Sequence, residues 1–118
     1  MKQVPNLVLA AAIAAAFCGA LYAAPPSPAG DPANGRKVYE YWCATCHGRG
    51  AGHPGTQSLE VKYRGKAPAA LEDRTDLSPP VTANFVRRGF ALMPPFRKTE
   101  ISDSEMHDIA AYLGKTPK

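Results

Sequence analysis

The run Cys43-Ala44-Thr45-Cys46-His47 limits the possible folds of this chain more than any other part of its sequence. A C-x-x-C-H run is the attachment signature of a c-type haem. The two cysteine sulfurs add to the haem vinyl groups, and the adjacent histidine is placed to ligate the iron. The sequence therefore predicts one covalently attached haem c, held by Cys43, Cys46 and His47, with the rest of the chain wrapped around it.

Cys43 and Cys46 would also suit a thioredoxin-type redox pair or half of a zinc site. A redox pair of that kind follows a strand in a βαβ setting, and no run of this chain alternates convincingly at the strand period. A closed zinc site needs four ligands, and His53 and His107 are the only histidines outside the run. Because His47 directly follows Cys46, its ring would join both sulfurs around one tetrahedral ion only with difficulty. Haem attachment is the interpretation that fits the whole pentapeptide.

Met93 is the candidate for the second axial ligand of the iron. Met1 belongs to the N-terminal segment, and Met106 lies on the apolar stripe of the last expected helix, where core packing is its expected role. Met93 stands in a loop, and Pro94-Pro95 fix the backbone after it. The alternatives are that Met93 fills a gap in the core or that His53 takes the sixth position. Ligation by histidine and methionine favours ferrous iron and raises the reduction potential, which suits electron transfer.

Other residues near the haem are predicted from chemistry alone. His47 needs an acceptor for its second ring nitrogen, and the backbone carbonyl of Pro54, which follows a glycine-rich loop, is the expected one. Tyr63 and Phe96 are candidates for pocket walls, with ordinary core packing an equal alternative. One or two basic side chains are expected to pair with the haem propionates, and the candidates are Arg64, Arg74, Arg87, Arg88, Arg97 and Lys98.

The first part of the chain has the pattern of an export signal. Lys2 gives a positive start, residues 7–17 are apolar, and small residues allow cleavage after Ala23 or Ala24. We therefore expect residues 1–23 to be a signal peptide, residues 24–30 a proline-rich linker and residues 31–118 a mono-haem domain in the periplasm. An uncleaved membrane anchor is the alternative. Acylation of Cys18 is disfavoured, because that cleavage requires a small residue where Phe17 stands.

The charge balance argues against one class of partner. The formal net charge is +4, and it falls close to neutral once Lys2 leaves with the signal and two haem propionates are added. No block of basic residues is interleaved with exposed aromatic residues, as a nucleic-acid groove would require. We therefore expect a solvated surface and no nucleic-acid partner.

Helix signals dominate the expected domain. Asp31-Pro32 is an N-cap followed by a first-turn proline, and it begins a helix that should run to about Ala44. Residues 102–105 form a capping box for a last helix that Gly114 ends. Gly35 predicts that these two helices cross closely. Between them we expect short helical pieces within residues 58–63 and 68–74 and a helix from Ser78 or Pro79 to Arg88, stopped by Gly89. The predicted fold class is all-α.

Several of these segments together resemble class I c-type cytochromes. They are Gly35-x-x-x-Tyr39, the C-x-x-C-H run, Met93-Pro94 and the Tyr112-Leu113 end of the last helix. The resemblance covers essentially the whole domain. It implies the class I cytochrome c fold, in which the N- and C-terminal helices cross, short helices and loops surround one covalent haem, and the haem edge is exposed for electron transfer.

A closer likeness is to the cytochrome c subunits of flavocytochrome alkylphenol hydroxylases, of the eugenol hydroxylase and p-cresol methylhydroxylase type. It is carried by His53-Pro54-Gly55-Thr56 and by residues 72–77, 86–89 and 93–100. It implies a FAD-containing hydroxylase subunit that oxidises a para-alkylphenol and passes electrons singly to this haem. The chain itself would be an electron-transfer protein and not an enzyme. A copper protein or another cytochrome is the expected acceptor downstream.

Other functions stay open from the residues alone. A freely diffusing cytochrome that carries electrons between another periplasmic dehydrogenase and a terminal oxidase would have the same site. A haem enzyme or gas sensor would need an open sixth position, against which Met93 argues. A membrane-tethered carrier would follow only if the signal segment is retained. Residues 91–96 are the expected docking face for the flavoprotein, with Arg97 and Lys98 beside them, because they combine apolar bulk with a fixed backbone.

Overall fold

The computed structural model describes residues 29–114 of the chain. The predicted signal peptide, with Cys18, and residues 24–28 of the predicted linker lie outside these residues. The described part contains helices α1 (Pro32–Trp42), α2 (Ala44–His47), α3 (Pro54–Tyr63), α4 (Pro79–Arg88) and α5 (Asp103–Leu113), and one turn of 3-10 helix, η1 (Leu71–Asp73). It has no strand, only an isolated bridge between Phe90 and Met93. The all-α prediction is confirmed.

The helix ends follow the capping signals of the sequence. The Asp31 side chain accepts a hydrogen bond from the Ala33 N–H at 2.9 Å, and α1 begins at the next proline. Ser102 and Glu105 form a complete capping box at the start of α5, and Gly114 follows its last residue. Because these signals act within a few residues, local sequence was enough to predict the start of α1 and both ends of α5.

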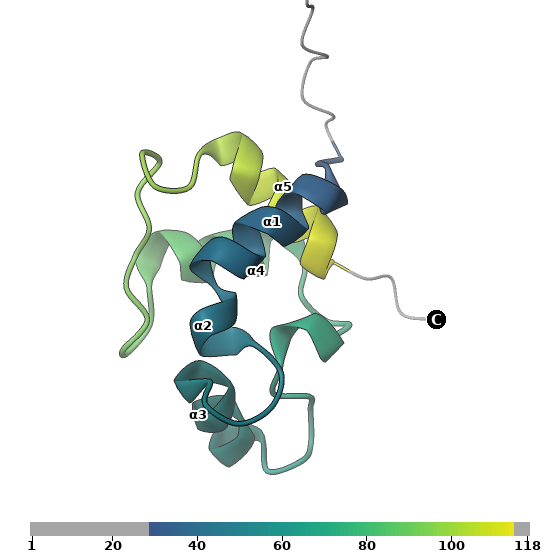
Figure 1. Ribbon diagram of the computed structural model, residues 1–118, viewed down its shortest axis with the longest axis vertical. Helices are drawn as coiled ribbons and strands as arrows, with labels where there is room; N and C mark the ends of the chain where they lie inside the picture. The colour runs from purple at the N-terminus through teal and green to yellow at the C-terminus, as the bar shows by residue number, and fades with distance from the viewer. Residues whose placement is uncertain (1–28, 115–118) are drawn as a thin grey trace, which may run out of the picture.

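The central contact of the fold is the crossing of α1 and α5, which lies in the upper part of Figure 1. A Cβ atom on Gly35 would lie 1.9 Å from the carbonyl oxygen of Asp108, so only glycine allows this approach. The Asp108 carboxylate accepts hydrogen bonds from the backbone N–H of Asp31 and from the Asn34 side chain, each at 2.7 Å. The predicted close crossing at Gly35 is confirmed.

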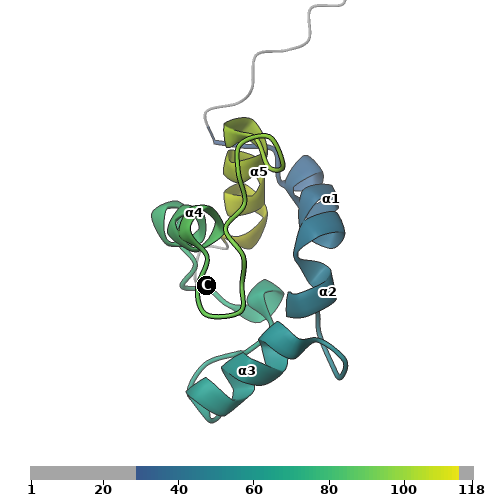
Figure 2. The same ribbon diagram turned by 90° about the vertical axis from the view of Figure 1, so that its left-hand side faces the viewer.

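The apolar core lies around this crossing. Its buried residues come from α1, α4, α5 and the segment before α5: Val38, Tyr39, Val86, Ile101, Met106, Ile109 and Leu113. In contrast, α3 buries only Thr56. Figures 1 and 2 both place α3 beyond α2, at the end of the molecule away from the α1–α5 crossing. The molecule therefore has a well-packed end and an end with little core of its own.

Two helices differ from the predictions. The first helix was expected to continue to about Ala44, but it stops at Trp42, and Cys43, with φ −113° and ψ −37°, separates it from α2. The helical piece expected within residues 58–63 is the second half of α3, which already begins at Pro54. Proline at the first helical position fits without loss of a hydrogen bond. Within residues 68–74 only η1 is helical.

Candidate functional site

The pentapeptide forms the Cys43 break and the whole of α2. Cys43 is half-buried and packs against the core cluster, whereas Cys46 is exposed, and neither forms a disulfide. Burial raises the pKa of the Cys43 thiol to about 11, with the neighbouring Cys46 as a second cause. Cys43 and Cys46 therefore present one sheltered and one accessible sulfur on adjacent turns.

Side chains from other segments bind the backbone carbonyls at the end of this short helix. The Tyr39 hydroxyl donates to the His47 carbonyl at 2.8 Å, and the Thr56 hydroxyl donates to the Gly48 carbonyl at 2.8 Å. The His53 Nδ1 lies 3.0 Å from the Thr45 carbonyl and donates to it in the tautomer that carries the proton there. A helix leaves its last carbonyls without intrahelical donors, so these contacts fix the backbone that carries His47.

The His47 ring is half-buried and its Nδ1 has no hydrogen-bond partner within the described residues. Burial lowers the pKa of this imidazole, which favours the neutral form. Gly55 lies against the ring: a Cβ atom there would be 2.8 Å from the His47 Cε1 and 2.7 Å from the Cys46 carbonyl oxygen. A neutral imidazole is the form that ligates metals, so the ring is held in the state that ligation requires.

The predicted hydrogen bond from His47 to the Pro54 carbonyl is absent. Pro54 is the first residue of α3, and its carbonyl accepts a hydrogen bond from the Ser58 hydroxyl at 2.8 Å. His53-Pro54-Gly55 instead acts through packing at Gly55 and through the His53 contact with Thr45. The sequence indicated that this segment supports His47. Because α3 begins at Pro54, the support comes from the His53 ring and from Gly55 and not from the Pro54 carbonyl.

Met93 is held in a tight turn that follows α4. The backbone N–H of Phe90 donates to the Met93 carbonyl at 3.0 Å, and the Met93 N–H donates to the Phe90 carbonyl at 2.9 Å. Gly89, with φ +66°, allows this turn, since a Cβ there would lie 2.5 Å from the Met93 carbonyl oxygen. The Phe96 N–H then donates to the Val86 carbonyl and ties the segment back to α4. Met93 is half-buried and packs against the core cluster that Cys43 also contacts.

Residues 30–113 match the model of a known family, described as cytochrome c oxidase, cbb3-type, subunit III. The chain belongs to this family of cytochrome c domains. It therefore has the class I cytochrome c fold, binds a covalently attached haem c and acts in haem-based electron transfer rather than as an enzyme. A search of curated proteins finds no significant match.

The residues of this cytochrome c domain fit the cofactor. The His47 imidazole and the Met93 thioether are the kinds of group that ligate haem iron, and the free sulfurs of Cys43 and Cys46 are available for thioether bonds to its vinyl groups. Within residues 29–114 no group of three or more His, Cys, Asp and Glu side chains is arranged to hold a metal ion. No helix among those residues is long and apolar enough to cross a membrane.

The structure also shows the contacts of the two candidate wall residues, Phe96 and Tyr63, and of two candidate propionate partners, Arg74 and Arg87. Phe96 packs against the core cluster and edge-on to Trp42, with 5.7 Å between ring centroids. Tyr63 lies beneath the Arg74 guanidinium, 4.7 Å from it, and Arg74 binds Asp76 through Nε at 2.8 Å. Arg87 donates to the carbonyls of Phe96 and Ile101 and pairs with Asp103.

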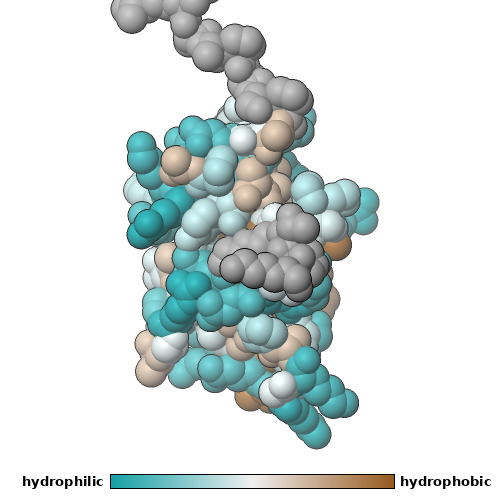
Figure 3. Space-filling model, turned by 90° about the vertical axis from the view of Figure 1, so that its right-hand side faces the viewer, coloured by the Kyte–Doolittle hydropathy of each residue, from teal (hydrophilic) through white to brown (hydrophobic). Residues whose placement is uncertain are grey.

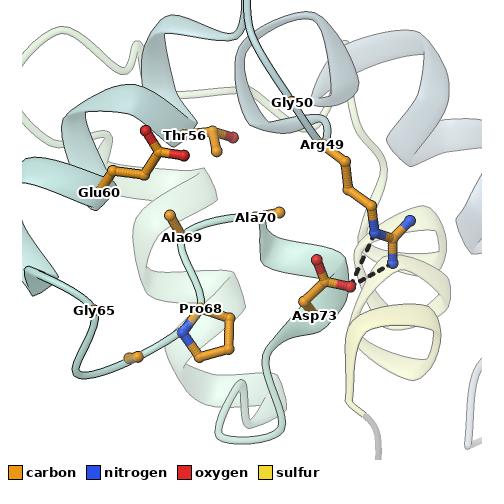
Figure 4. A pocket seen from close by; sticks show the side chains of 10 residues that line it. Arg49, Gly50, Thr56, Glu60, Gly65, Pro68, Ala69, Ala70 and Asp73 are labelled. Carbon is orange, nitrogen blue, oxygen red and sulfur yellow. Dashed lines mark hydrogen bonds and ion pairs between the residues drawn. The ribbon is translucent and has the colours of Figure 1, made fainter.

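One surface hollow lies beside the site and not at it. It has a volume of about 330 Å³ and is formed by the glycine-rich loop, α3 and the segment before η1 (Figure 4). Arg49 spans its edge and binds Asp73 at 2.7 Å and Glu72 at 2.8 Å. None of Cys43, Cys46, His47 and Met93 lines it. Its charged edge is therefore used in structural ion pairs.

Proposed function

We propose that this cytochrome c domain holds its haem through Cys43 and Cys46, ligates the iron through His47 and Met93, and works in the periplasm as the electron-accepting subunit of a flavoprotein alkylphenol hydroxylase. When bound, the haem supplies a centre that takes up and releases one electron at a time. The observation that carries the proposal is that the His47 turn and the Met93 turn border one core cluster, each with its backbone fixed by hydrogen bonds.

The protein residues have separate tasks in this proposal. Tyr39, His53 and Thr56 hold the backbone of the His47 turn. Gly89 and the paired hydrogen bonds between Phe90 and Met93 hold the methionine. A site whose ligands are fixed by their supports changes little in geometry when an electron arrives, which keeps the barrier to transfer low. His53 as the sixth ligand is less well supported, because its ring already contacts the carbonyl of Thr45 on the His47 side.

The ligand assignment is tested by Met93→Ala, with Met106→Leu as a control that changes the buried methionine of α5. We expect Met93→Ala to abolish the far-red sulfur-to-iron band of the ferric protein, to lower the reduction potential by on the order of 100 mV, and to let carbon monoxide bind the ferrous form. Met106→Leu should keep the band and the potential. If the Met93→Ala protein keeps both the band and the reduction potential, Met93 is not an axial ligand of the iron.

The partner assignment rests on the resemblance of residues 53–56, 72–77, 86–89 and 93–100 to alkylphenol hydroxylase cytochrome subunits. It is tested by purifying the native protein under mild conditions and identifying what accompanies it. A stoichiometric large subunit that contains flavin and that reduces this haem when a para-alkylphenol is added is the expected result. A purely monomeric haem protein would overturn the assignment.

A second candidate is a diffusing periplasmic carrier that delivers electrons to a terminal oxidase. It is favoured by the description of the matched family, which names a subunit of a cytochrome c oxidase. The same purification separates the two candidates, because a carrier of this kind forms no stable complex with a dehydrogenase. Mass spectrometry of the native N-terminus would also distinguish a cleaved protein from a membrane-tethered one.

A further inference from the structure

Three segments that are far apart in the chain meet at the carboxylate of Glu72. Arg49, from the glycine-rich loop after His47, donates through Nη1 to one carboxylate oxygen at 2.8 Å. Tyr112, from the last turn of α5, donates its hydroxyl to the other oxygen. Glu72 is the middle residue of η1, so its side chain ties this turn both to the loop and to the end of α5.

Glu72 is more sheltered from water than the charges around it. Its side chain is 17% exposed, whereas the exposed fraction is 53% for Arg49 and 47% for Asp73, the second carboxylate that binds Arg49 (Figure 4). Figure 3 faces the side on which α5 ends, and hydrophilic residues cover most of that side. Water and salt screen an exposed charge more strongly than a sheltered one. Of these three charges, the carboxylate of Glu72 therefore acts most strongly on the interior.

Two routes connect this carboxylate to the turn that carries His47. The first is the chain itself, because Arg49 follows His47 by two residues. The second passes through two rings: Tyr112 packs against Tyr39 with 5.6 Å between centroids, and the Tyr39 hydroxyl donates to the His47 carbonyl at 2.8 Å. Burial raises the pKa of Tyr39, and the Glu72 carboxylate is the next cause of that rise. The field of Glu72 thus reaches a hydroxyl that contacts the backbone of His47.

A fixed negative charge affects the two oxidation states of a haem unequally. Ferric haem carries one positive charge more than ferrous haem, so a nearby carboxylate stabilises the ferric form more. Stabilisation of the ferric form lowers the reduction potential. The size of the effect depends on how well the charge is sheltered and on how firmly it is held in place, and Glu72 is both sheltered and held on each of its oxygens.

We propose that Glu72 lowers the reduction potential of the haem, because its carboxylate, fixed by Arg49 and Tyr112, stabilises ferric iron. The inference rests on the proposed attachment of the haem beside His47 and does not depend on the sixth ligand or on the identity of the partner. A lower potential makes the reduced domain a stronger electron donor to its acceptor. It also gives a task to η1, which contributes no predicted ligand.

The test is a redox titration of the full haem protein, in which Glu72→Gln is compared with Asp73→Asn. Each variant removes one negative charge that is paired with Arg49, and glutamine still offers an oxygen to the Tyr112 hydroxyl. At the midpoint potential of the parent, we expect Glu72→Gln to raise the ratio of ferrous to ferric haem about threefold to tenfold. Asp73→Asn should change this ratio by less than about twofold, because its carboxylate is more exposed.

Two further measurements separate charge from packing. Glu72→Asp keeps the charge, so its ratio should lie within about twofold of the parent value. At high salt, Glu72→Gln should keep most of its effect, whereas any effect of Asp73→Asn should shrink. A change of the same size in Glu72→Asp and Glu72→Gln would come from disturbed packing of η1 and would overturn the proposal.

The proposal and the proposed function can fail separately. A Glu72→Gln protein that titrates like the parent, or like Asp73→Asn, would overturn the role of Glu72 and leave the proposed function intact. Conversely, a far-red band that survives Met93→Ala, or a native protein without a flavin subunit, would overturn parts of the proposed function without altering the effect of Glu72→Gln.

Discussion

Tyr39 connects the core of the molecule to the turn that carries His47. Its side chain is 1% exposed, and its ring packs against Tyr112 with 5.6 Å between centroids. Its hydroxyl donates to the carbonyl of His47 at 2.8 Å. Since that carbonyl ends α2 and has no following helical turn, Tyr39 replaces a missing backbone donor. The orientation of the proposed iron ligand therefore depends in part on one buried hydroxyl.

Tyr39→Phe keeps the ring and removes only this hydroxyl. We expect the free energy of unfolding to fall by about 1–3 kcal/mol, because a partly buried carbonyl loses its partner. We also expect a shift in the reduction potential, which a purely structural role in the core would leave unchanged. Denaturant unfolding and a redox titration measure the two effects.

Tyr41→Phe is the matched control, because Tyr41 lies on the same helix and is 76% exposed. Its stability and potential should equal those of the parent protein. If Tyr39→Phe behaves like Tyr41→Phe in both measurements, the hydroxyl does not position His47.

At the residue scale, the sequence indicates the candidate haem residues but not the side chains that support them. Cys43, Cys46, His47 and Met93 are recognised by their residue types and neighbours alone, and their roles remain predictions. The contacts of His53 with the Thr45 carbonyl and of Thr56 with the Gly48 carbonyl were missed. Each of these contacts spans eight residues and exists only because α3 packs beside α2, and no local pattern encodes that packing.

Among the helices, the capping residues determined what could be predicted. α1, α4 and α5 begin or end at an N-cap, a proline or a glycine, which act locally. The full length of α3 was missed, because it buries only Thr56 and so shows no apolar stripe to mark its extent. The break at Cys43 was missed for a related reason: residues on both sides have ordinary helix-forming side chains.

The α1–α5 crossing gives a prediction at the scale of these elements. In Gly35→Ala the added Cβ would meet the Asp108 carbonyl at 1.9 Å, so the helices must move apart. The shift would also disturb the hydrogen bonds of the Asp108 carboxylate with Asp31 and Asn34. We expect a loss of about 3 kcal/mol in the free energy of unfolding, measured by denaturant titration of the helical circular dichroism.

Lys37→Ala serves as the control on the same helix, because Lys37 is exposed. It should alter stability by less than about 0.5 kcal/mol. A Gly35→Ala protein that unfolds at the same denaturant concentration as the parent would contradict the close approach.

The whole molecule divides into parts that are stabilised differently. The end at the α1–α5 crossing is well packed. Five residues of α5 are buried there: Met106, Asp108, Ile109, Ala110 and Leu113. At the other end, α3 is joined to the rest by the hydrogen bonds of His53 and Thr56 and by the packing of Gly55 against His47. A small domain with an incomplete core needs a further stabilising group, and the covalently attached haem c would supply it.

Removal of the haem should therefore act unequally on the helices. We expect hydrogen exchange in α3 and in residues 89–97 to become faster by on the order of tenfold or more when the thioether bonds are cleaved with a silver salt, whereas the centres of α1 and α5 keep more of their protection. The physical reason is that α5 retains its apolar contacts, while α3 loses the group that its single buried residue cannot replace. Hydrogen-exchange mass spectrometry of the haem-bound and haem-free proteins, under identical conditions, compares each helix with itself. Equal protection of α3 in both forms would mean that its contacts with the His47 turn suffice, and would contradict a stabilising role of the haem for this helix.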